Sequence, residues 1–237
     1  MYFKNIKSVV VDIDGKGTLD VMKNLTAKAK VSDEVMDSSG YYQTVEVIDG
    51  ERPDIMSKRL YNTEIYHWTF LLLNPQIKNI WDDWPMKYSQ LEEYCIQKYQ
   101  YLCADTDDDL NNKFILGETV KGSVSSALGT IKEIHVNLGY IVIDLTSGTF
   151  KSTGETIYGL DSQDSASCGF IKSQAYAPHH HVDDSSGDWV PRREAGTTPY
   201  TYIDYESAVT EQNRQLKVIK PQYISRLARH FAKVMSA

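Results

Sequence analysis

The stretch APHHHVDDSSGDWV, residues 177–190, holds the densest group of metal-binding side chain types in the sequence. Alternate side chains of an extended strand share one face, which places His179, His181 and Asp183 together. Two imidazoles and a carboxylate are an accepted ligand set for zinc or non-haem iron, and such a site would support metal-assisted hydrolysis. Neighbouring residues of one strand rarely converge on one ion, however, and DDSSGDW is typical of a polar turn. We favour the turn and keep these three residues as metal candidates.

A second stretch with catalytic residue types is SVVVDIDGKGT, residues 8–18, in which a β-run leads into Asp12 and Asp14. This spacing resembles the first motif of haloacid-dehalogenase-type phosphatases, where one aspartate attacks phosphorus and the next handles the proton. Such enzymes need a doubly wound sheet, and the chain shows no regular alternation of strands and helices. Lys16 also departs from the motif. A glycine turn after a strand is the favoured interpretation.

Other motifs of catalysis are absent from the sequence. It contains no nucleophile elbow, phosphate-binding loop, zinc-protease helix or dinucleotide-binding glycine pattern. The stretch from Asp12 onward lacks the acidic positions of an EF-hand calcium loop. We therefore expect no enzymatic activity and no cofactor.

Composition narrows the classes of partner. The formal net charge is −7 and no dense Lys/Arg cluster offsets it, which argues against nucleic acid. No apolar run reaches the roughly twenty residues of a membrane span, and no export signal is present. Cys95, Cys103 and Cys168 are odd in number and form no CxxC, so we expect reduced thiols in a cytosol-like compartment. The 16 tyrosines are of a type that favours protein interfaces.

The first half of the chain mixes an extended segment with helices. Residues 1–40 predict an extended N-terminal arm, and YYQTVEVID at 41–49 predicts a β-strand. Helices are predicted from Pro53, where proline suits the first turn, and over the apolar EIYHWTFLLLN, whose Trp68 we place in the core. A further helix is predicted over SQLEEYCIQKYQYL, residues 89–102, before the acidic boundary loop CADTDDDLNNK.

The middle of the chain contains an internal repeat. FILGETVKGSVSSALGTIKEI at 114–134 is echoed by FKSTGETIYGLDSQDSASCGFIKSQ at 150–174, and the alternating strand GYIVIDLTSGTF lies between the copies. Two strand-rich units this short cannot each bury a face alone. We therefore expect one small β-barrel over 112–174, of the oligonucleotide-fold or Src-homology kind.

The chain returns to helices near its end. DYESAVTEQNRQ predicts a helix, LKVIK predicts a short β-run, and Pro221 opens a last amphipathic helix. Ile224, Leu227 and Phe231 belong to the apolar stripe of that helix. If the stripe is exposed, it forms a partner-binding face.

Two separated blocks carry a resemblance to a known family. The block DGERPDIMSKRLYNTEIYHWTFLLLNPQIKNIWDDWPMKYSQLEEYCIQKY, residues 49–99, resembles the baseplate wedge component with a LysM-like core found in contractile-tailed, T-even-like bacteriophages. The ordered motifs of the family are RP, A or S-x-x-L/I-Y-G/N, Y-W, LL-x-x-N, W-P and a terminal KY. The corresponding segments here read RP, SKRLYN, YHW, LLLN, WP and KY. The C-terminal DYESAVTEQNRQLKVIKPQYISRLARHFAKVM resembles the end of the same family.

This resemblance implies an α+β fold in which a LysM-like βααβ core is interrupted by the barrel before its closing strand. The predicted parts are the N-terminal arm, the first part of the core, the inserted barrel, a connector with a hairpin, and the C-terminal part that closes the core, at 1–40, 41–104, 112–174, 175–203 and 204–237. Insertion at a surface loop is tolerated when the termini of the inserted unit can lie close together.

The function implied by the resemblance is structural. The chain would join neighbouring wedge subunits around the central hub of a six-fold tail baseplate, assembled in the host cytoplasm and retained in the virion. Its partners would be other wedge and hub proteins rather than nucleic acid or membrane. Aromatic and apolar anchors dominate such interfaces, and the candidates here are Trp81, Trp84, Trp189, Ile224, Leu227 and Phe231.

A binding module for peptidoglycan is the alternative. Free-standing LysM domains hold N-acetylglucosamine chains in a shallow groove beside the first helix. In this chain GERP, residues 50–53, stands where such domains usually carry GDTL, and no second LysM unit follows. We keep this alternative but do not favour it.

Overall fold

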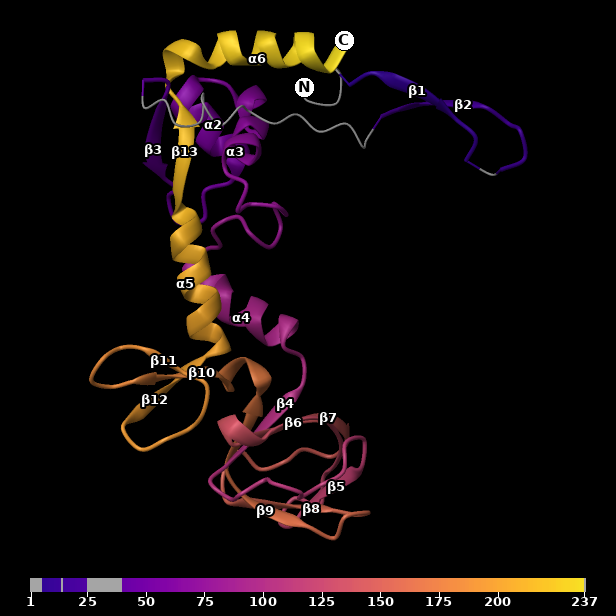
Figure 1. Ribbon diagram of the computed structural model, residues 1–237, viewed down its shortest axis with the longest axis vertical. Coiled ribbons are helices and arrows are strands. Elements are labelled where there is room, and N and C mark those ends of the chain that lie inside the picture. Colours follow the sequence, from indigo (N-terminus) through magenta and orange to yellow (C-terminus); the bar gives the residue numbers. More distant parts are fainter. Residues whose placement is uncertain (1–5, 14, 25–39, 237) are drawn as a thin grey trace. The chain divides into compact units, whose positions relative to one another are not determined.

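The structure is a computed structural model that describes residues 6–13, 15–24 and 40–236 (Figure 1). It is an α+β fold that contains a closed six-stranded barrel. The chain forms two compact units: unit 1 comprises residues 1–88 and 210–237, and unit 2 comprises residues 89–209. In this division residues 89–104 group with unit 2, and the boundaries predicted at 104 and 204 stay predictions.

A two-stranded antiparallel sheet joins distant parts of unit 1. Strand β3 (Tyr42–Glu46) pairs with β13 (Gln215–Ile219), so that Tyr42 lies opposite Ile219 and Glu46 opposite Gln215. Between these strands in the sequence come α2, the 3₁₀ turn η2 and α3, which span Pro53–Tyr61, Glu64–Tyr66 and Trp68–Leu73. Pro53 occupies the first turn of α2, where its missing N–H removes no helical hydrogen bond.

The side chain of Asn74 ties α3 to the closing strand. Its amide group donates to the carbonyl oxygens of Phe70 at 2.7 Å and Lys217 at 2.9 Å, and its Oδ1 accepts from the Lys217 N–H at 2.9 Å. Asn74 is buried, so these three bonds satisfy polar groups that would otherwise be costly inside the core. One amide therefore specifies where the helix ends and how it meets β13.

Apolar side chains from both ends of the chain form the core of unit 1. One cluster consists of Val47, Met56, Phe70, Ile77, Trp84, Leu216 and Val218. The last helix, α6 (Pro221–Ser236), buries Phe231 against Trp68 with ring centroids 4.4 Å apart, and Ile224 joins a cluster with Leu73 and Ile219. The apolar stripe of α6 therefore packs on unit 1 itself, and Trp68 is a core residue as predicted.

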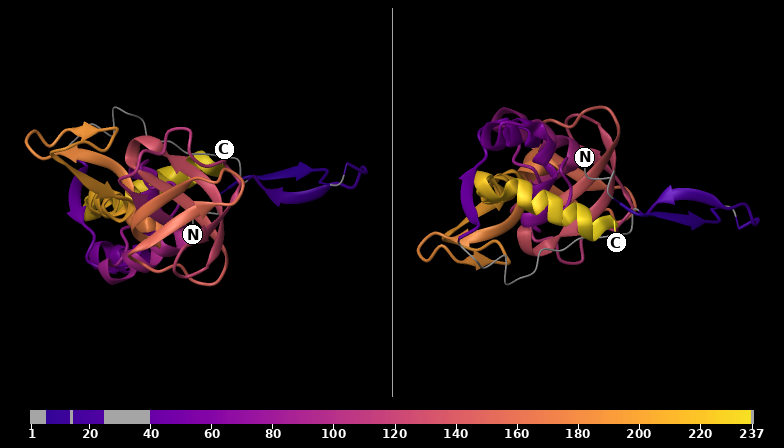
Figure 2. Two further views of the ribbon diagram at one scale, coloured as in Figure 1. Left: turned by 90° about the horizontal axis from the view of Figure 1, so that it is seen from below. Right: turned by 90° about the horizontal axis from the view of Figure 1, so that it is seen from above.

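The described part of the N-terminal segment forms a hairpin, drawn in indigo in Figures 1 and 2. Strands β1 (Ser8–Val11) and β2 (Asp20–Lys23) are antiparallel, with Ser8 opposite Lys23. The Asp12 carboxylate accepts a hydrogen bond from the Gly17 N–H at 2.8 Å, as expected of a glycine turn. Asp14, the second carboxylate of the phosphatase-like motif, lies outside the described residues.

The closed barrel of unit 2 has the strand order β4-β7-β6-β5-β8-β9, and pairing of β4 with β9 completes the ring (Figure 2). Its strands are β4 (Leu102–Thr106), β5 (Thr119–Gly122), β6 (Leu128–His135), β7 (Tyr140–Ser147), β8 (Glu155–Gly159) and β9 (Ser165–Ser173). The predicted barrel is confirmed, although six strands exceed the five of an oligonucleotide fold.

The barrel begins earlier than the sequence pattern predicts. Helix α4 (Tyr88–Lys98) ends before Leu102, and the segment predicted as helix end and acidic loop forms strand β4 instead. The strand receives its ladder bonds from β7 and β9, so Leu102 pairs with both Ile143 and Ser173. Because these partners are distant in sequence, local periodicity does not reveal them.

The remaining elements of unit 2 follow the barrel or interrupt it. They are the 3₁₀ turns η3 (Val136–Leu138) and η4 (Gln174–Tyr176) and the strands β10 (Pro178–Asp183), β11 (Trp189–Val190) and β12 (Thr197–Thr201). Helix α5 (Tyr202–Arg214) includes the sequence boundary between the units at residues 209 and 210. The three strands form a separate sheet in the order β11-β10-β12.

The buried glutamate carboxylate of each GET repeat contacts the turn that follows the other repeat. Glu155 accepts from the N–H groups of Val124 at 2.6 Å and Lys151 at 3.1 Å, and it therefore fixes the turn that follows the first repeat. Glu118 reciprocates by accepting from the N–H groups of Asp161 at 3.2 Å and Ser162 at 3.0 Å after the second repeat. Both glutamates are almost fully buried. Each repeat thus stabilises the turn of the other, and we call this pair of contacts, made by Glu118 and Glu155, the reciprocal lock.

The glycine that ends each motif is required by the same contact. A Cβ atom on Gly122 would lie 3.0 Å from the Glu155 carboxyl carbon, and one on Gly159 would lie 2.6 Å from Glu118 Oε2. A side chain at either position would push the carboxylate away from its turn. The shared G-E-T-x-x-G spacing is explained by this close approach.

Replacement of Glu155 with alanine should destabilise the barrel by about 3 kcal/mol, because buried N–H donors lose a charged acceptor. The matched control is Glu133→Ala, since Glu133 is exposed and bonds His135. The free energy of unfolding is measured from barrel amide signals during urea titration by NMR. An equal free energy of unfolding for Glu155→Ala and Glu133→Ala would contradict a stabilising role of the Glu155 contacts.

The contribution of Glu155 should also depend on acidity. Burial alone would raise the pKa of Glu155, but hydrogen bonds donated by Val124, Ser125 and Lys151 outweigh it and lower the pKa to about 2 from 4.5. Because the folded pKa is depressed, the stabilisation is complete above pH 4.5 and is lost as the pH falls toward 2. The stability difference between wild type and Glu155→Gln should therefore shrink over that range. A difference that stays constant would argue against the lowered pKa.

Candidate functional site

The histidine run occupies β10, the central strand of its three-stranded sheet. His181 lies opposite Val190 on β11 and Pro199 on β12. The pairing with β12 shifts register between Pro178 and His180, and this irregularity interrupts the simple alternation of faces. The assumption of an ideal strand, on which the metal prediction rested, does not hold here.

The three metal candidates make separate contacts. His179 stacks on Tyr205 with ring centroids 4.3 Å apart, whereas His181 is buried and contacts Thr197. The Asp183 carboxylate accepts from the N–H groups of Ser185 at 2.9 Å and Ser186 at 2.8 Å. Within residues 6–13, 15–24 and 40–236, no three His, Cys, Asp or Glu side chains are placed to hold a metal ion. His179, His181 and Asp183, the three metal candidates, therefore do not converge on one point in the described structure.

The polar-turn interpretation describes what Asp183 does. The turn donors hold the pKa of Asp183 at about 2, with the hydroxyl of Ser185 as the main cause. Gly187 follows with φ at 75°, and its N–H donates to the Asp183 carbonyl at 2.9 Å. The carboxylate is thus used to shape the β10–β11 hairpin.

His180 belongs to an aromatic group on the sheet. Its ring lies 4.7 Å from Tyr200 and 5.8 Å from Trp189, measured between ring centroids. Trp189 is 67% exposed, so this group presents an indole to the surface. Burial, followed by the neighbouring His179, lowers the pKa of His180. A neutral imidazole beside an exposed indole suits packing against an apolar partner surface.

The tautomer of His181 follows from its hydrogen-bond partner. The Thr197 hydroxyl lies 2.8 Å from the Glu194 carbonyl, to which it donates, and 3.1 Å from His181 Nδ1. This arrangement favours the tautomer with the proton on Nδ1 and the lone pair on Nε2. Nε2 is buried and receives no protein hydrogen bond within the described residues.

A cavity of about 410 Å³ lies beside His181. Its other walls come from the barrel strands β4 and β9 and from the connector, namely Asp105, Phe170, Lys172, Tyr176, Pro178, Arg193, Glu194, Thr197, Pro199 and Thr201. Arg193 pairs with Asp105 at 3.1 Å and with Asp107 at 2.7 Å. The Arg193 guanidinium thus links the connector to the barrel, a role that its place in the sequence did not indicate.

The ionic groups of this cavity do not form a recognised catalytic arrangement. Burial raises the pKa of Asp105, while Arg193 opposes the rise. The cavity walls include no serine or cysteine beside the imidazole of His181. The three cysteines are free, as predicted, and burial raises the pKa of Cys95 to about 11 and of Cys168 to about 12, which disfavours reactive thiolates.

The predicted interface residues divide into exposed and buried sets. Trp81 is 84% exposed and Trp189 is also exposed. Trp84 is buried and its indole N–H donates to the Glu51 carbonyl at 2.7 Å, so this side chain packs inside unit 1. Ile224 and Phe231 are likewise buried in the core of unit 1. Leu227 is half-buried at the edge of a second cavity.

No protein-family model matches the chain, and no curated protein is similar to it. Among the helices that the structure describes, none has the length and apolar character needed to cross a membrane.

NMR of the imidazole nitrogens should find His181 neutral, with the proton on Nδ1, at pH 6.5. Burial, with Arg193 and His180 as further causes, lowers its pKa below 6.5, whereas the urea-unfolded chain should be about half protonated there. Thr197→Val should weaken the tautomer preference by removing the acceptor. A proton on Nε2 of the folded chain would refute the assigned hydrogen-bond pattern.

Proposed function

We propose that the chain is a structural component of the baseplate wedge of a contractile-tailed, T-even-like bacteriophage. It would join neighbouring wedge subunits around the hub in a six-fold assembly, formed in the host cytoplasm and retained in the virion. The motifs in residues 49–99 and 204–235 carry the family resemblance. The order strand β3, helices α2 and α3, and strand β13 supports a LysM-like core, with the barrel inserted before the closing strand.

The main support from the structure is the apolar surface of the β1–β2 hairpin. Leu19 is 68% exposed, Val21 is 74% exposed, and Val10 and Ile13 are also exposed. An isolated two-stranded hairpin is marginally stable in water, and gathered apolar side chains on a surface mark interaction sites. An assembly component would cover this ribbon with a neighbouring subunit, which would bury the side chains and stabilise the strands.

A binding role is also consistent with the contacts of the polar residues in the β1–β2 turn and in residues 177–190. The Asp12 carboxylate bonds the backbone of its own turn, and Asp183 does the same in the β10–β11 hairpin. His179 and His180 pack against aromatic rings. These groups therefore shape loops and surfaces, in keeping with a protein whose work is recognition rather than catalysis.

The peptidoglycan alternative receives less support from unit 1. Glu51 of the GERP segment is buried and forms an ion pair with Arg59 at 2.7 Å, just before the start of α2. The Trp84 indole bonds the Glu51 carbonyl, and the Lys87 side chain packs 3.6 Å from the Cβ position of Gly50. The surface where a sugar would lie beside the first helix is thus contacted by the chain's own side chains.

Co-expression with the wedge proteins encoded in the same genome should give a complex that elutes early in size-exclusion chromatography. Val21→Asp should reduce complex formation, because it places a charge on the apolar hairpin. The matched control is Val136→Asp, which alters an exposed valine of the η3 turn, away from the Glu118 and Glu155 contacts, and should leave the complex intact. A chain that stays monomeric beside every wedge protein of its phage would refute the proposal.

Sedimentation with purified peptidoglycan tests the alternative. We expect no more retention of the chain than of an unrelated protein of similar charge. Trp84→Phe, which removes the N–H donor to Glu51 and retains an aromatic ring, should leave this background unchanged. Specific retention, with competition by chitin oligosaccharides, would favour the sugar-binding function instead.

A further inference from the structure

A locally basic segment closes a chain whose net charge is −7. Residues 215–237 contain five Lys and Arg residues and no Asp or Glu. Three of the five lie on α6, as Arg226, Arg229 and Lys233, and His230 lies among them. Since the opposite side of the helix packs into unit 1 through Ile224 and Phe231, the basic side chains face outward and are exposed. The net negative charge of the whole chain gives no indication of this basic surface.

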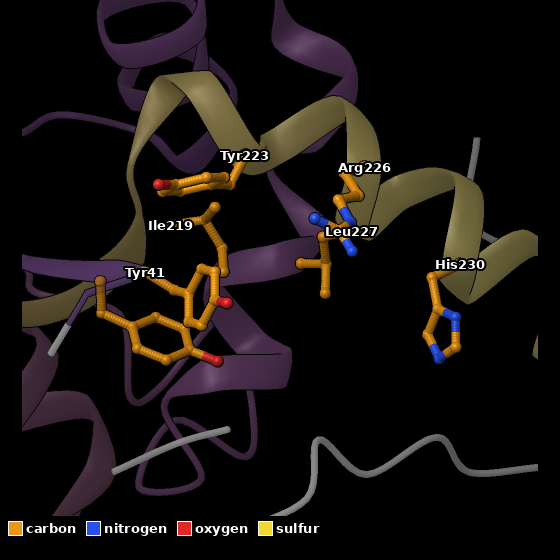
Figure 3. Close-up of a pocket in the computed structure, with 7 residues that line it drawn as sticks. Tyr41, Ile219, Tyr223, Arg226, Leu227 and His230 are labelled. Atoms are coloured by element: carbon orange, nitrogen blue, oxygen red, sulfur yellow. The ribbon is translucent and has the colours of Figure 1, made fainter. Parts of the chain in front are cut away.

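A cavity of about 290 Å³ lies between α6 and the end of the β3–β13 sheet (Figure 3). It is lined by Tyr41, Tyr42, Ile219, Tyr223, Arg226, Leu227 and His230. The rings of Tyr41 and Tyr223 meet edge to face with centroids 5.1 Å apart. Aromatic and aliphatic walls of this kind fit one apolar side chain of a bound segment.

Tyr42 adds a polar group to these apolar walls. The residue is only 6% exposed, and its hydroxyl has no hydrogen-bond partner within the described residues. Burial raises the pKa of Tyr42, so the hydroxyl keeps its proton and is available as a donor. An unpaired buried hydroxyl costs free energy, which an acceptor on a bound segment would recover.

The edge of the cavity is cationic, and among the described residues no carboxylate forms an ion pair with it. Arg226 and His230 are one helical turn apart on α6, and Figure 3 shows Arg226 beside Leu227 and His230 further along the helix. Elsewhere in unit 1, Arg59 and Arg214 each pair with a carboxylate. Within the residues described, Arg226 makes no such ion pair. A guanidinium without a carboxylate favours an acidic ligand, which it can bind in a bidentate manner.

We propose that this cavity docks an acidic segment of a partner protein, with one apolar side chain against Tyr41, Tyr223 and Leu227 and a carboxylate at Arg226. Protein is favoured over nucleic acid because the walls are apolar at the base and the remainder of the chain is acidic, which opposes an extended phosphate backbone. The proposal concerns the chemistry of the partner segment and stands whether or not that partner belongs to a baseplate.

Titration of the full, isotope-labelled chain with the blocked peptide acetyl-Asp-Glu-Leu-Phe-Asp-Glu-amide tests the proposal by NMR. We expect signals of Tyr41, Tyr223 and Leu227 to shift, with affinity that falls as salt is raised. Arg226→Ala should weaken binding roughly tenfold, the loss of one charge-assisted hydrogen bond. Tyr42→Phe should weaken it by a smaller factor, because only the hydroxyl is removed.

Arg229→Ala is the matched control, since it removes the same charge from the same helix at a position that does not line the cavity. It should keep the affinity of the wild type within about twofold. Spectra of all variants must match the wild type away from the cavity, which excludes a loss of folding as the cause.

Several results would overturn the proposal. They are equal binding of the neutral peptide with Asn and Gln in place of Asp and Glu, an equal loss in Arg226→Ala and Arg229→Ala, and displacement of the peptide by short duplex DNA at lower concentration. Absence of shifts at the cavity with about 1 mM peptide would overturn it as well. A result with the wedge complex alone bears on the proposed function and leaves this test unaffected.

Discussion

The pairing of β3 with β13 is the interaction on which the rest of unit 1 depends. These strands are separated by the whole of unit 2 in the sequence, yet their side chains share one core with α2 and α3. The Asn74 side chain bonds Lys217 through both its amide nitrogen and its carbonyl oxygen, across 143 positions. Loop-closure entropy rises only slowly with length, so a long insertion is tolerated if its own ends meet. The barrel provides this, because its first strand β4 pairs with its last strand β9.

The barrel is likewise held together by contacts between segments that are distant in sequence. Glu118 and Glu155 each bond the turn that follows the other repeat, so neither hairpin is complete without its partner. Buried carboxylates in a pocket often signal catalysis, because active sites hold charges that burial would otherwise exclude. Here every nearby donor is a backbone N–H or a serine of a tight turn, and the pKa of both carboxylates is lowered. The two carboxylates fix the conformation of two turns, and their close approach leaves room only for glycine at positions 122 and 159.

Sequence patterns anticipated those features that depend on neighbouring residues. Proline at positions 53 and 221 marked two helix starts, and the spaced glycines and glutamates of the repeat indicated the barrel. Features set by distant partners escaped. Strand β4 was hidden because its ladder comes from β7 and β9, and the alternation expected of His179 and His181 was broken by a register shift against β12. Trp81 and Trp84 share one loop, but Trp84 is buried by distant parts of the chain, through an apolar cluster with Phe70 and Leu216 and a hydrogen bond to the Glu51 carbonyl.

The groups that stabilise the fold differ from the groups that the described fold leaves exposed. The polar clusters of the turns are bonded to their own backbone, and Glu118, Glu155 and Asn74 are satisfied inside the two units. What the described fold leaves uncovered is different in kind: apolar side chains on the β1–β2 hairpin, the indoles of Trp81 and Trp189, and a cationic edge on α6. Their spread over several elements of both units supports the proposed assembly role, because a separate neighbouring subunit could cover each surface.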